Sequence, residues 1–282
     1  MKYILVFFLI LLLNPGWSQE LYVYSEPASN VPSRSLSFKY GSKWMREKSL
    51  LHEHISSRHM LETSLGISKT LMVRPAITFG NMYSAYPDQQ QKFESISIYL
   101  KYRFLSIDDV HKHFRGSFYA KGLYSKNPLL YDELTIDGDQ SAFQFGLIAT
   151  QLINKLALSA TGSIHQVLDG ERFLKYGGPR RFGYQAFNYS LSTGYLLLPR
   201  KYKSYDQTNF NIYLEVLGGK GIDRKYDFID LAPAVQLIFK SSSKLNLGYR
   251  FQLDANAYRM ATSSFYLSFE KTFLNKLGKK SK

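Results

Sequence analysis

The chain has 282 residues, of which 36 are lysine or arginine and 22 are aspartate or glutamate, so its formal net charge is +14. It contains no cysteine, which excludes a disulfide scaffold, a thiolate metal site, a catalytic cysteine and a lipid anchor on an N-terminal cysteine. Aromatic residues make up 16% of the chain. The length allows one large domain or two small ones.

The N-terminus carries the features of an export signal. Lys2 is followed by an unbroken apolar run, Tyr3–Leu13, which is shorter than the roughly 20 residues that a membrane helix needs. A charged start, a short apolar core and small residues at Gly16 and Ser18 are typical of a secretory signal peptide. The alternative is a buried N-terminal helix. We expect residues 1–18 to be a signal peptide.

Beyond residue 34 the apolar residues recur with a period of two. In the last such segment Phe265, Leu267 and Phe269 alternate with polar neighbours, which places them on one face of a strand. The same alternation, taken in chain order, predicts strands at 35–44, 60–69, 72–83, 93–105, 115–126, 141–152, 155–167, 185–198, 208–217, 229–241, 243–254 and 261–273.

The length of these segments favours a membrane barrel over a soluble sheet protein. They run about 10 to 13 residues, whereas strands of soluble proteins usually have about 5 or 6. A tilted strand needs about 9 to 11 residues to cross a bilayer, and only a closed sheet satisfies every backbone group in lipid. The alternative is a soluble β-sandwich or a lipocalin-like barrel, whose strands also alternate.

We therefore predict an all-β protein, a closed antiparallel transmembrane β-barrel of about 12 strands. The barrel covers 35–273, a periplasmic N-terminal segment covers 19–34, and a basic tail covers 274–282. An even strand count puts both chain ends on one side, and export puts that side in the periplasm. The short and long connections alternate as expected for periplasmic turns and outer loops. The predicted location is the outer membrane of a Gram-negative bacterium.

Several stretches carry a resemblance to known barrels. They are SLGISKTLMVRPAITFGNMYS (64–84), YLKYRFLSIDDVHKHFRGSFYAKG (99–122), AFNYSLSTGYLLLPR (186–200) and SSFYLSFEKTF (263–273). With them the chain resembles an outer-membrane β-barrel of the Bacteroidota type and, more loosely, the transporter-like barrels of the meta-pathway of phenol degradation. This resemblance implies a channel or uptake role and supplies no catalytic residues.

The polar faces of the predicted strands would line the lumen. They carry nine basic and five acidic residues, and rings of Arg and Lys favour anions. The residues that we expect to shape the lumen are Lys101, Arg103, Arg115, Glu215, Arg250 and Glu270. Reversing the charges of Arg103 and Arg250 should then shift ion selectivity toward cations. The alternative is that the charges pair across the lumen and plug it.

The histidines are the metal candidates. His52, His54 and His59 lie in the predicted first outer loop, 45–59. Imidazole suits divalent metals and copper, although loop histidines are more often simply solvated. We expect no cofactor.

Three functions remain open. The first is a narrow channel through which a small solute, whose identity the sequence does not name, crosses the outer membrane. The second is a non-conducting structural or partner-binding barrel. The third is a metal-handling barrel that uses the first outer loop. We expect no enzymatic activity, because the chain has no H-E-x-x-H, G-x-S-x-G or glycine-rich phosphate motif.

The expected partners follow from the predicted location. They are outer-membrane lipid, a small solute and the barrel-assembly machinery during biogenesis. Nucleic acid is not expected, because the basic residues do not form one patch with aromatic stacking platforms. We expect a monomer.

Overall fold

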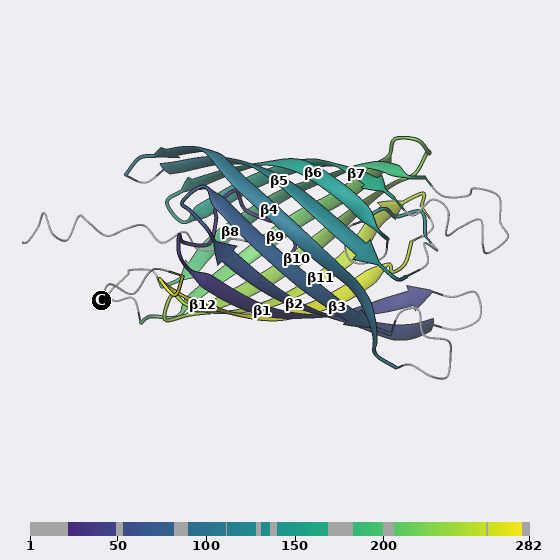
Figure 1. The fold of residues 1–282 in the computed structure, drawn as a ribbon, viewed down its shortest axis with the longest axis horizontal. Helices are drawn as coiled ribbons and strands as arrows, with labels where there is room; N and C mark the ends of the chain where they lie inside the picture. Colours follow the sequence, from purple (N-terminus) through teal and green to yellow (C-terminus); the bar gives the residue numbers. More distant parts are fainter. Residues whose placement is uncertain are drawn as a thin grey trace, which may run out of the picture.

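The computed structural model describes residues 22–48, 53–81, 90–110, 112–127, 131–135, 140–168, 183–199, 206–257 and 259–277. Twelve antiparallel strands form a barrel that closes where β1 pairs with β12 (Figure 1). The strands are β1 (Leu36–Lys48), β2 (Glu53–Gly66), β3 (Leu71–Gly80), β4 (Lys92–Asp108), β5 (Lys112–Ser125), β6 (Ala142–Ile153), β7 (Leu156–Val167), β8 (Gln185–Leu198), β9 (Asn209–Gly221), β10 (Asp227–Phe239), β11 (Ser243–Ala255) and β12 (Ser263–Phe273). Over this part of the chain no helix has the length and apolar character needed to cross a membrane.

The predicted fold class is confirmed. Each strand pairs with its sequence neighbours, and Leu36 lies opposite Phe273 where the barrel closes. The first strand end and the last therefore lie at the same end of the barrel, as an even number of strands requires. We call this the turn end, because the connection between β6 and β7 there is two residues long; the opposite end is the loop end.

The largest error of the strand prediction is at β2. We expected this strand to begin at residue 60, but it begins at Glu53 and pairs with β1 up to Lys48. The first connection at the loop end is therefore shorter than the predicted loop 45–59. His54 and His59 lie on a strand and not in a loop.

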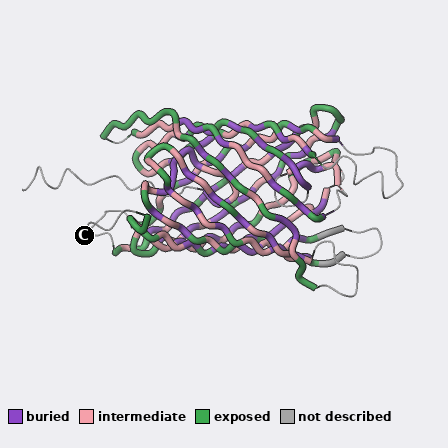
Figure 2. The backbone as a smooth tube through the Cα atoms, viewed as in Figure 1, coloured by how far each residue is buried: buried purple, intermediate pink, exposed green. Residues whose placement is uncertain are grey.

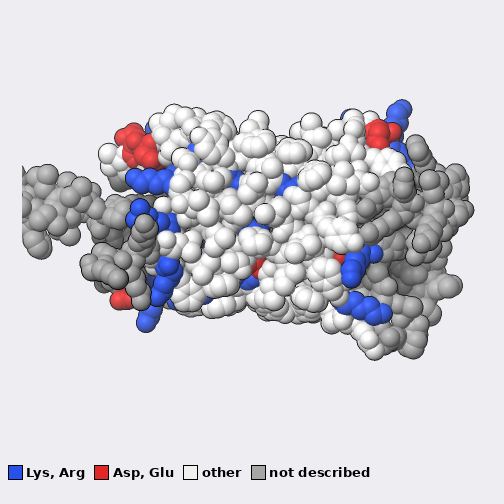
Figure 3. All heavy atoms as spheres, viewed as in Figure 1, with Lys and Arg blue, Asp and Glu red and all other residues white. Residues whose placement is uncertain are grey.

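The outer surface is an apolar belt. Along each strand exposed and buried residues alternate, and the exposed positions are large and apolar (Figure 2). Leu147 of β6 and Leu191 of β8 are both more than half exposed, at 59% and 58%. In the face shown in Figure 3, lysine, arginine and acidic residues gather toward both ends, and the middle is almost uncharged. An apolar band between polar rims is what a lipid-facing barrel presents.

The interior holds polar and charged side chains together with the segment that precedes β1. Residues 22–34, which we call the inner segment, contact side chains of β3, β4, β5, β6, β8 and β9 on the inward face. We predicted a periplasmic segment over 19–34, outside the barrel. Residues 22–34 lie inside the barrel, where inward side chains of the wall satisfy backbone groups that would otherwise bond to water.

Candidate functional site

A single buried carboxylate holds the start of the inner segment. Glu215 of β9 is fully buried. Its two carboxylate oxygens accept hydrogen bonds from the backbone amides of Val23 and Tyr24, both at 2.9 Å, and of Ser25 at 2.7 Å. Three successive amides around one carboxylate form an anion nest, an arrangement that satisfies both the charge and the backbone donors. The side chain of Ser25 also contacts Ser192 of β8, with 2.7 Å between the two hydroxyl oxygens.

The middle of the inner segment is fixed by charge. The carboxylate of Glu26 pairs with Arg74 of β3 and lies 3.4 Å from the Lys101 amine of β4. The same amine donates to the carbonyl of Pro27 at 2.9 Å. Lys101 is fully buried, and a buried ammonium needs such partners to remain charged. The inner segment therefore brings a carboxylate to two basic groups of the wall, of which Arg74 also lies 3.9 Å from Glu62 of β2.

The segment then continues toward the turn end. Ala28 donates its amide to the hydroxyl of Thr150 at 2.9 Å and accepts from the hydroxyl of Ser117 at 2.6 Å. Arg115 donates to Ser29 at 2.9 Å. Asn30 donates its side-chain amide to the carbonyl of the turn between β2 and β3 at 2.8 Å. The inner segment is thus bonded to the wall along most of its length.

A second segment enters the lumen from the loop end. Residues 131–135, which we call the inward loop, belong to the connection between β5 and β6. Leu134 is fully buried in an apolar cluster with Val167, Ala186, Tyr226 and Phe228. Asn188 of β8 donates to the Leu134 carbonyl at 3.1 Å. The inward loop is therefore packed against the inner face of the wall.

Four charges anchor the inward loop. Glu133 accepts from Arg259 at 2.9 Å and from Arg250 at 3.1 Å. Asp230 of β10 pairs with both arginines, and the Arg259 guanidinium lies 4.3 Å from the centre of the Phe228 ring. Burial of Arg259 acts to lower its pKa, but the hydrogen bonds and charges of Asp230 and Glu133 outweigh it and raise the pKa above its usual value. Arg259 therefore keeps its positive charge in this cluster.

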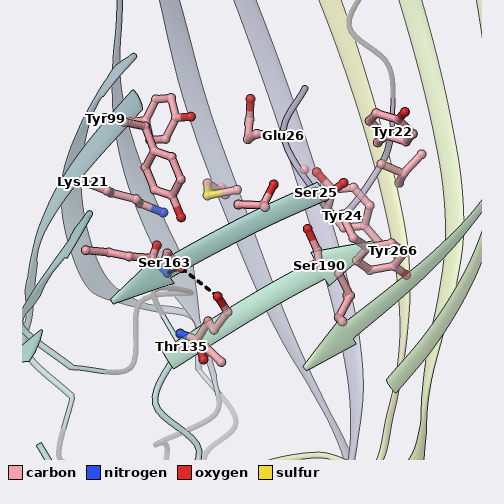
Figure 4. Close-up of a pocket in the computed structure, with 18 of the residues that line it drawn as sticks. Tyr22, Tyr24, Ser25, Glu26, Tyr99, Lys121, Thr135, Ser163, Ser190 and Tyr266 are labelled. Atoms are coloured by element: carbon pink, nitrogen blue, oxygen red, sulfur yellow. Dashed lines mark hydrogen bonds between the residues drawn. The ribbon is translucent and has the colours of Figure 1, made fainter. Parts of the chain in front are cut away.

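A cavity of about 320 Å³ lies between these two segments. The inner segment contributes Tyr22 and Tyr24, the inward loop contributes Thr135, and the strands supply the rest of its wall. In Figure 4 the labelled side chains of Tyr99, Lys121, Ser163, Ser190 and Tyr266 surround a common space between strands of opposite sides of the barrel. The cavity combines ring faces with charged groups, as ligand sites do.

The predicted lumen residues lie mostly where the alternation placed them, on the inward face, but each has a partner. Lys101, Arg115 and Glu215 contact the inner segment. Arg250 contacts the inward loop, and Glu270 bonds to Ser37 and lies 3.7 Å from Lys244 of the wall. Arg103 differs from the others in its place: it lies near the turn end beside a β-bulge, and its partner is a turn residue, because it donates to the carbonyl of Lys69 at 2.8 Å. Their role in selectivity stays a prediction.

The histidine candidates do not form a described metal site. His59 is an outward-facing residue of β2, and its Nδ1 atom lies 2.9 Å from both the Tyr40 and the Ser42 hydroxyl oxygens. His52 and the side chain of His54 lie outside the described residues. Within the described part of the chain no three histidine, aspartate or glutamate side chains gather as a metal site would require. Metal binding by the three histidines stays a prediction.

The residues that close the lumen were not among the predicted site residues. Glu26, Glu133 and Arg259 lie in connecting segments, which carry no periodic signal. The only signal was indirect: a polar segment before the first strand and acidic residues in a loop, beside an interior with a basic excess.

Comparisons with known proteins support the architecture. No family model and no curated protein sequence matches the chain. Among solved structures, an outer-membrane channel from Pseudomonas putida F1 is 13% identical, with a TM-score of 0.58 over 89% of this chain and 100% of that one. The KdgM porin (8% identical, TM-score 0.47, 84% of this chain and 99% of that one) and the NanC porin (9%, 0.48, 84% and 98%) are more distant. At these identities the likeness shows the fold alone. The resemblance to Bacteroidota-type and phenol-pathway barrels stays a prediction, and the conclusion is that the chain shares its barrel fold with proteins of bacterial outer membranes.

Proposed function

We propose that this protein is an outer-membrane channel for a small solute, closed in the described state by the inner segment and the inward loop. The observation that carries the proposal is the cavity on the barrel axis between the two segments. Protein interiors are normally close-packed. A hollow retained at mid-lumen, with charged side chains on its wall, is therefore better explained as part of a solute path than as structural filling.

The orientation follows from the connections. Short turns of outer-membrane barrels face the periplasm and longer loops face outward. The turn end would then be periplasmic, the inner segment would enter from the periplasm, and the inward loop would close the outer side. Export by residues 1–18, insertion by the barrel-assembly machinery and a monomeric state complete this proposal.

The inner segment has the properties of a movable closure. Up to Asn30 its bonds to the wall go through side chains such as Glu215, Lys101 and Arg115. Backbone pairing with β2 begins only at its end, where the Arg34 amide donates to the Gly66 carbonyl at 2.7 Å. Side-chain contacts break one at a time, whereas removing a strand would open the barrel and leave its backbone groups unpaired in lipid. The segment can therefore leave without loss of the fold.

A disulfide lock tests whether this closure moves. The hydroxyl oxygens of Ser25 and Ser192 lie 2.7 Å apart, close enough for Ser25→Cys and Ser192→Cys to form a bond of about 2.0 Å. The parent chain has no cysteine, so no other disulfide can form. We expect the current steps of the parent chain in planar bilayers to vanish in the oxidised double variant and to return on reduction. Each single variant is the control.

A truncated barrel tests the channel itself. We expect a chain without residues 19–30, and with glycine and serine in place of the inward loop, to conduct continuously, with currents that scale with salt. A truncated chain that is still heat-modifiable and β-rich but silent would refute the channel. That result would favour the second candidate, a non-conducting barrel. The many hydrogen bonds between the inner segment and the wall are the observation that favours this candidate.

A metal-handling barrel is the third candidate. Titration with copper or zinc of the refolded chain and of a His52→Ala/His54→Ala/His59→Ala variant separates it from the other two. Equal binding by both would remove it.

A further inference from the structure

The mid-lumen cavity has the size of a small-molecule site. Its 320 Å³ would hold on the order of ten water molecules at their liquid volume of about 30 Å³ each. It is bounded by residues from both closing segments, so a bound molecule would contact the inner segment and the inward loop at once. A solute of roughly that size fits without unfolding either closure.

Basic side chains outnumber acidic ones on the cavity wall. The acids on the wall are Glu26 and Glu62, and the bases are Lys39, Lys43, Arg58, Arg74, Lys121 and Arg250. The acids that pair with these bases from outside the wall are Glu94, Asp230 and Glu133. They are accompanied by Arg259 and Lys101, so the basic excess remains when the next layer is included. In a low-dielectric interior such an excess favours an anion.

The wall also offers hydrogen-bond donors and flat rings. Among the lining residues, the hydroxyls of Tyr22, Tyr24 and Thr161 are buried and hydrogen bond to no described protein group. Buried polar groups almost always have a partner, which can be a ligand or a water. Tyr99 and Tyr119 stack with 5.3 Å between ring centres, and tyrosine rings pack well against a flat molecule.

We propose that this cavity binds a small organic anion, with its oxyanion group at Lys121 and its body against the tyrosine rings. Figure 4 shows the Lys121 side chain extending into the cavity from the same side of the barrel as Tyr99. This inference rests on the proposed function, because a solute on its way through the barrel would pass this cavity. The ligand class is defined by charge and size: one carboxylate or similar group on a body of about ring size.

Equilibrium dialysis of the full mature chain in detergent tests the proposal. The probes are benzoate, which has a flat apolar body, gluconate, which has a hydroxylated one, inorganic phosphate, and choline as a cation of similar size. We expect one equivalent of benzoate or of gluconate to bind and choline not to bind. Which of the two binds more tightly identifies the body of the ligand. Binding of phosphate alone, or of choline as tightly as the anions, would overturn the proposal.

Two variants on one strand locate the site. Lys121→Gln removes one of the positive charges of the cavity wall, and we expect it to weaken binding about tenfold, which corresponds to the loss of one charge-assisted hydrogen bond. Lys112→Gln is the matched control, because Lys112 is an exposed residue at the other end of β5. Equal effects of both variants, or none from Lys121→Gln, would place the anion elsewhere and refute the inference.

The outcome is separable from that of the proposed function. An anion that binds with the expected variant pattern, in a chain whose truncated form stays silent in bilayers, would refute the channel and leave the binding site. A truncated form that conducts, in a chain that binds neither organic anion, would refute the binding site and leave the channel.

Discussion

Replacing Glu215 with glutamine should release the inner segment. The carboxylate of Glu215 accepts three backbone hydrogen bonds, from Val23, Tyr24 and Ser25. Glutamine keeps the shape but has one acceptor oxygen in place of two and carries no charge. At least one of the three backbone amides then loses its acceptor. In addition, the side-chain NH₂ group of the glutamine points a donor at backbone N–H groups, which are donors themselves.

The size of the effect follows from these bonds. A hydrogen bond to a charged group contributes about 1.5 to 3 kcal/mol net. Glutamine retains some of the three bonds in weaker form, so we expect the closed state to lose about 2 to 3 kcal/mol relative to the open state. Each 1.4 kcal/mol is a factor of ten. The ratio of open to closed should therefore rise roughly 30- to 150-fold.

Thiol labelling measures this ratio without depending on current. A Val23→Cys substitution places the single cysteine of the chain at a buried position of the inner segment. A water-soluble maleimide should react with it only when the segment leaves the lumen, and Glu215→Gln should raise the labelling rate by the factor above.

A second buried glutamate provides the matched control. Glu270 is a buried inward glutamate whose partners Ser37 and Lys244 belong to the wall. We expect Glu270→Gln to leave the labelling rate unchanged. No acceleration with Glu215→Gln, or an equal acceleration with Glu270→Gln, would refute the role assigned to Glu215.

Three further predictions concern the outer closure, the exit of the inner segment and the belt. Arg259→Gln leaves two buried carboxylates without a main partner, so protease cleavage within the inward loop should rise several-fold in an intact barrel; unchanged cleavage would contradict this. Gly66→Ala puts a methyl group 2.1 Å from a carbonyl oxygen of the inner segment and should lower the unfolding free energy, measured in urea, by about 1 to 3 kcal/mol. In the control Gly162→Ala the nearest contact of the methyl group is 3.4 Å away, so the loss should be far smaller. Leu147→Lys in the belt should cost about 2 to 4 kcal/mol and Val110→Lys in an exposed turn at most about 1; equal costs would argue against a lipid-facing belt.

The strands were predictable because their signal is local. Outward residues must be apolar in lipid and inward ones need not be, so a period of two marks every spanning segment. The early start of β2 was missed because its outward positions there, Ile55, Ser57 and His59, include a single apolar residue. That stretch extends past the apolar belt, where lipid no longer constrains the sequence.

The closures were not predictable because their partners are distant and polar. Glu215 holds backbone that lies 190 to 192 residues earlier in the chain. Backbone amides leave no trace in the side-chain pattern, so a segment bound through them looks like any other polar linker. The alternation correctly put Lys101 and Arg250 on the inward face. It held no information on whether Glu26 and Glu133, both outside the strands, would form ion pairs with these two residues.

Removal of the inner segment should also change the selectivity of the lumen. In the closed state Arg74 and Lys101 share the carboxylate of Glu26. When the segment leaves, that negative charge leaves with it, while both basic groups stay on the wall. The open lumen is therefore more positive than the closed one, and rings of basic residues favour anions. A KCl gradient across a bilayer that contains the truncated barrel should give a reversal potential on the anion side.

Two basic residues of β4 should contribute unequally to this selectivity. Lys101 is fully buried in the lumen, whereas Arg103 bonds to a turn carbonyl at the exposed rim. Salt screens exposed charges over about 8 to 10 Å, so a rim charge acts weakly on an ion inside the lumen. Lys101→Gln should move the reversal potential toward cations by clearly more than Arg103→Gln does. Equal shifts, or a truncated barrel that prefers cations from the start, would show that the charges released by the inner segment do not set the selectivity.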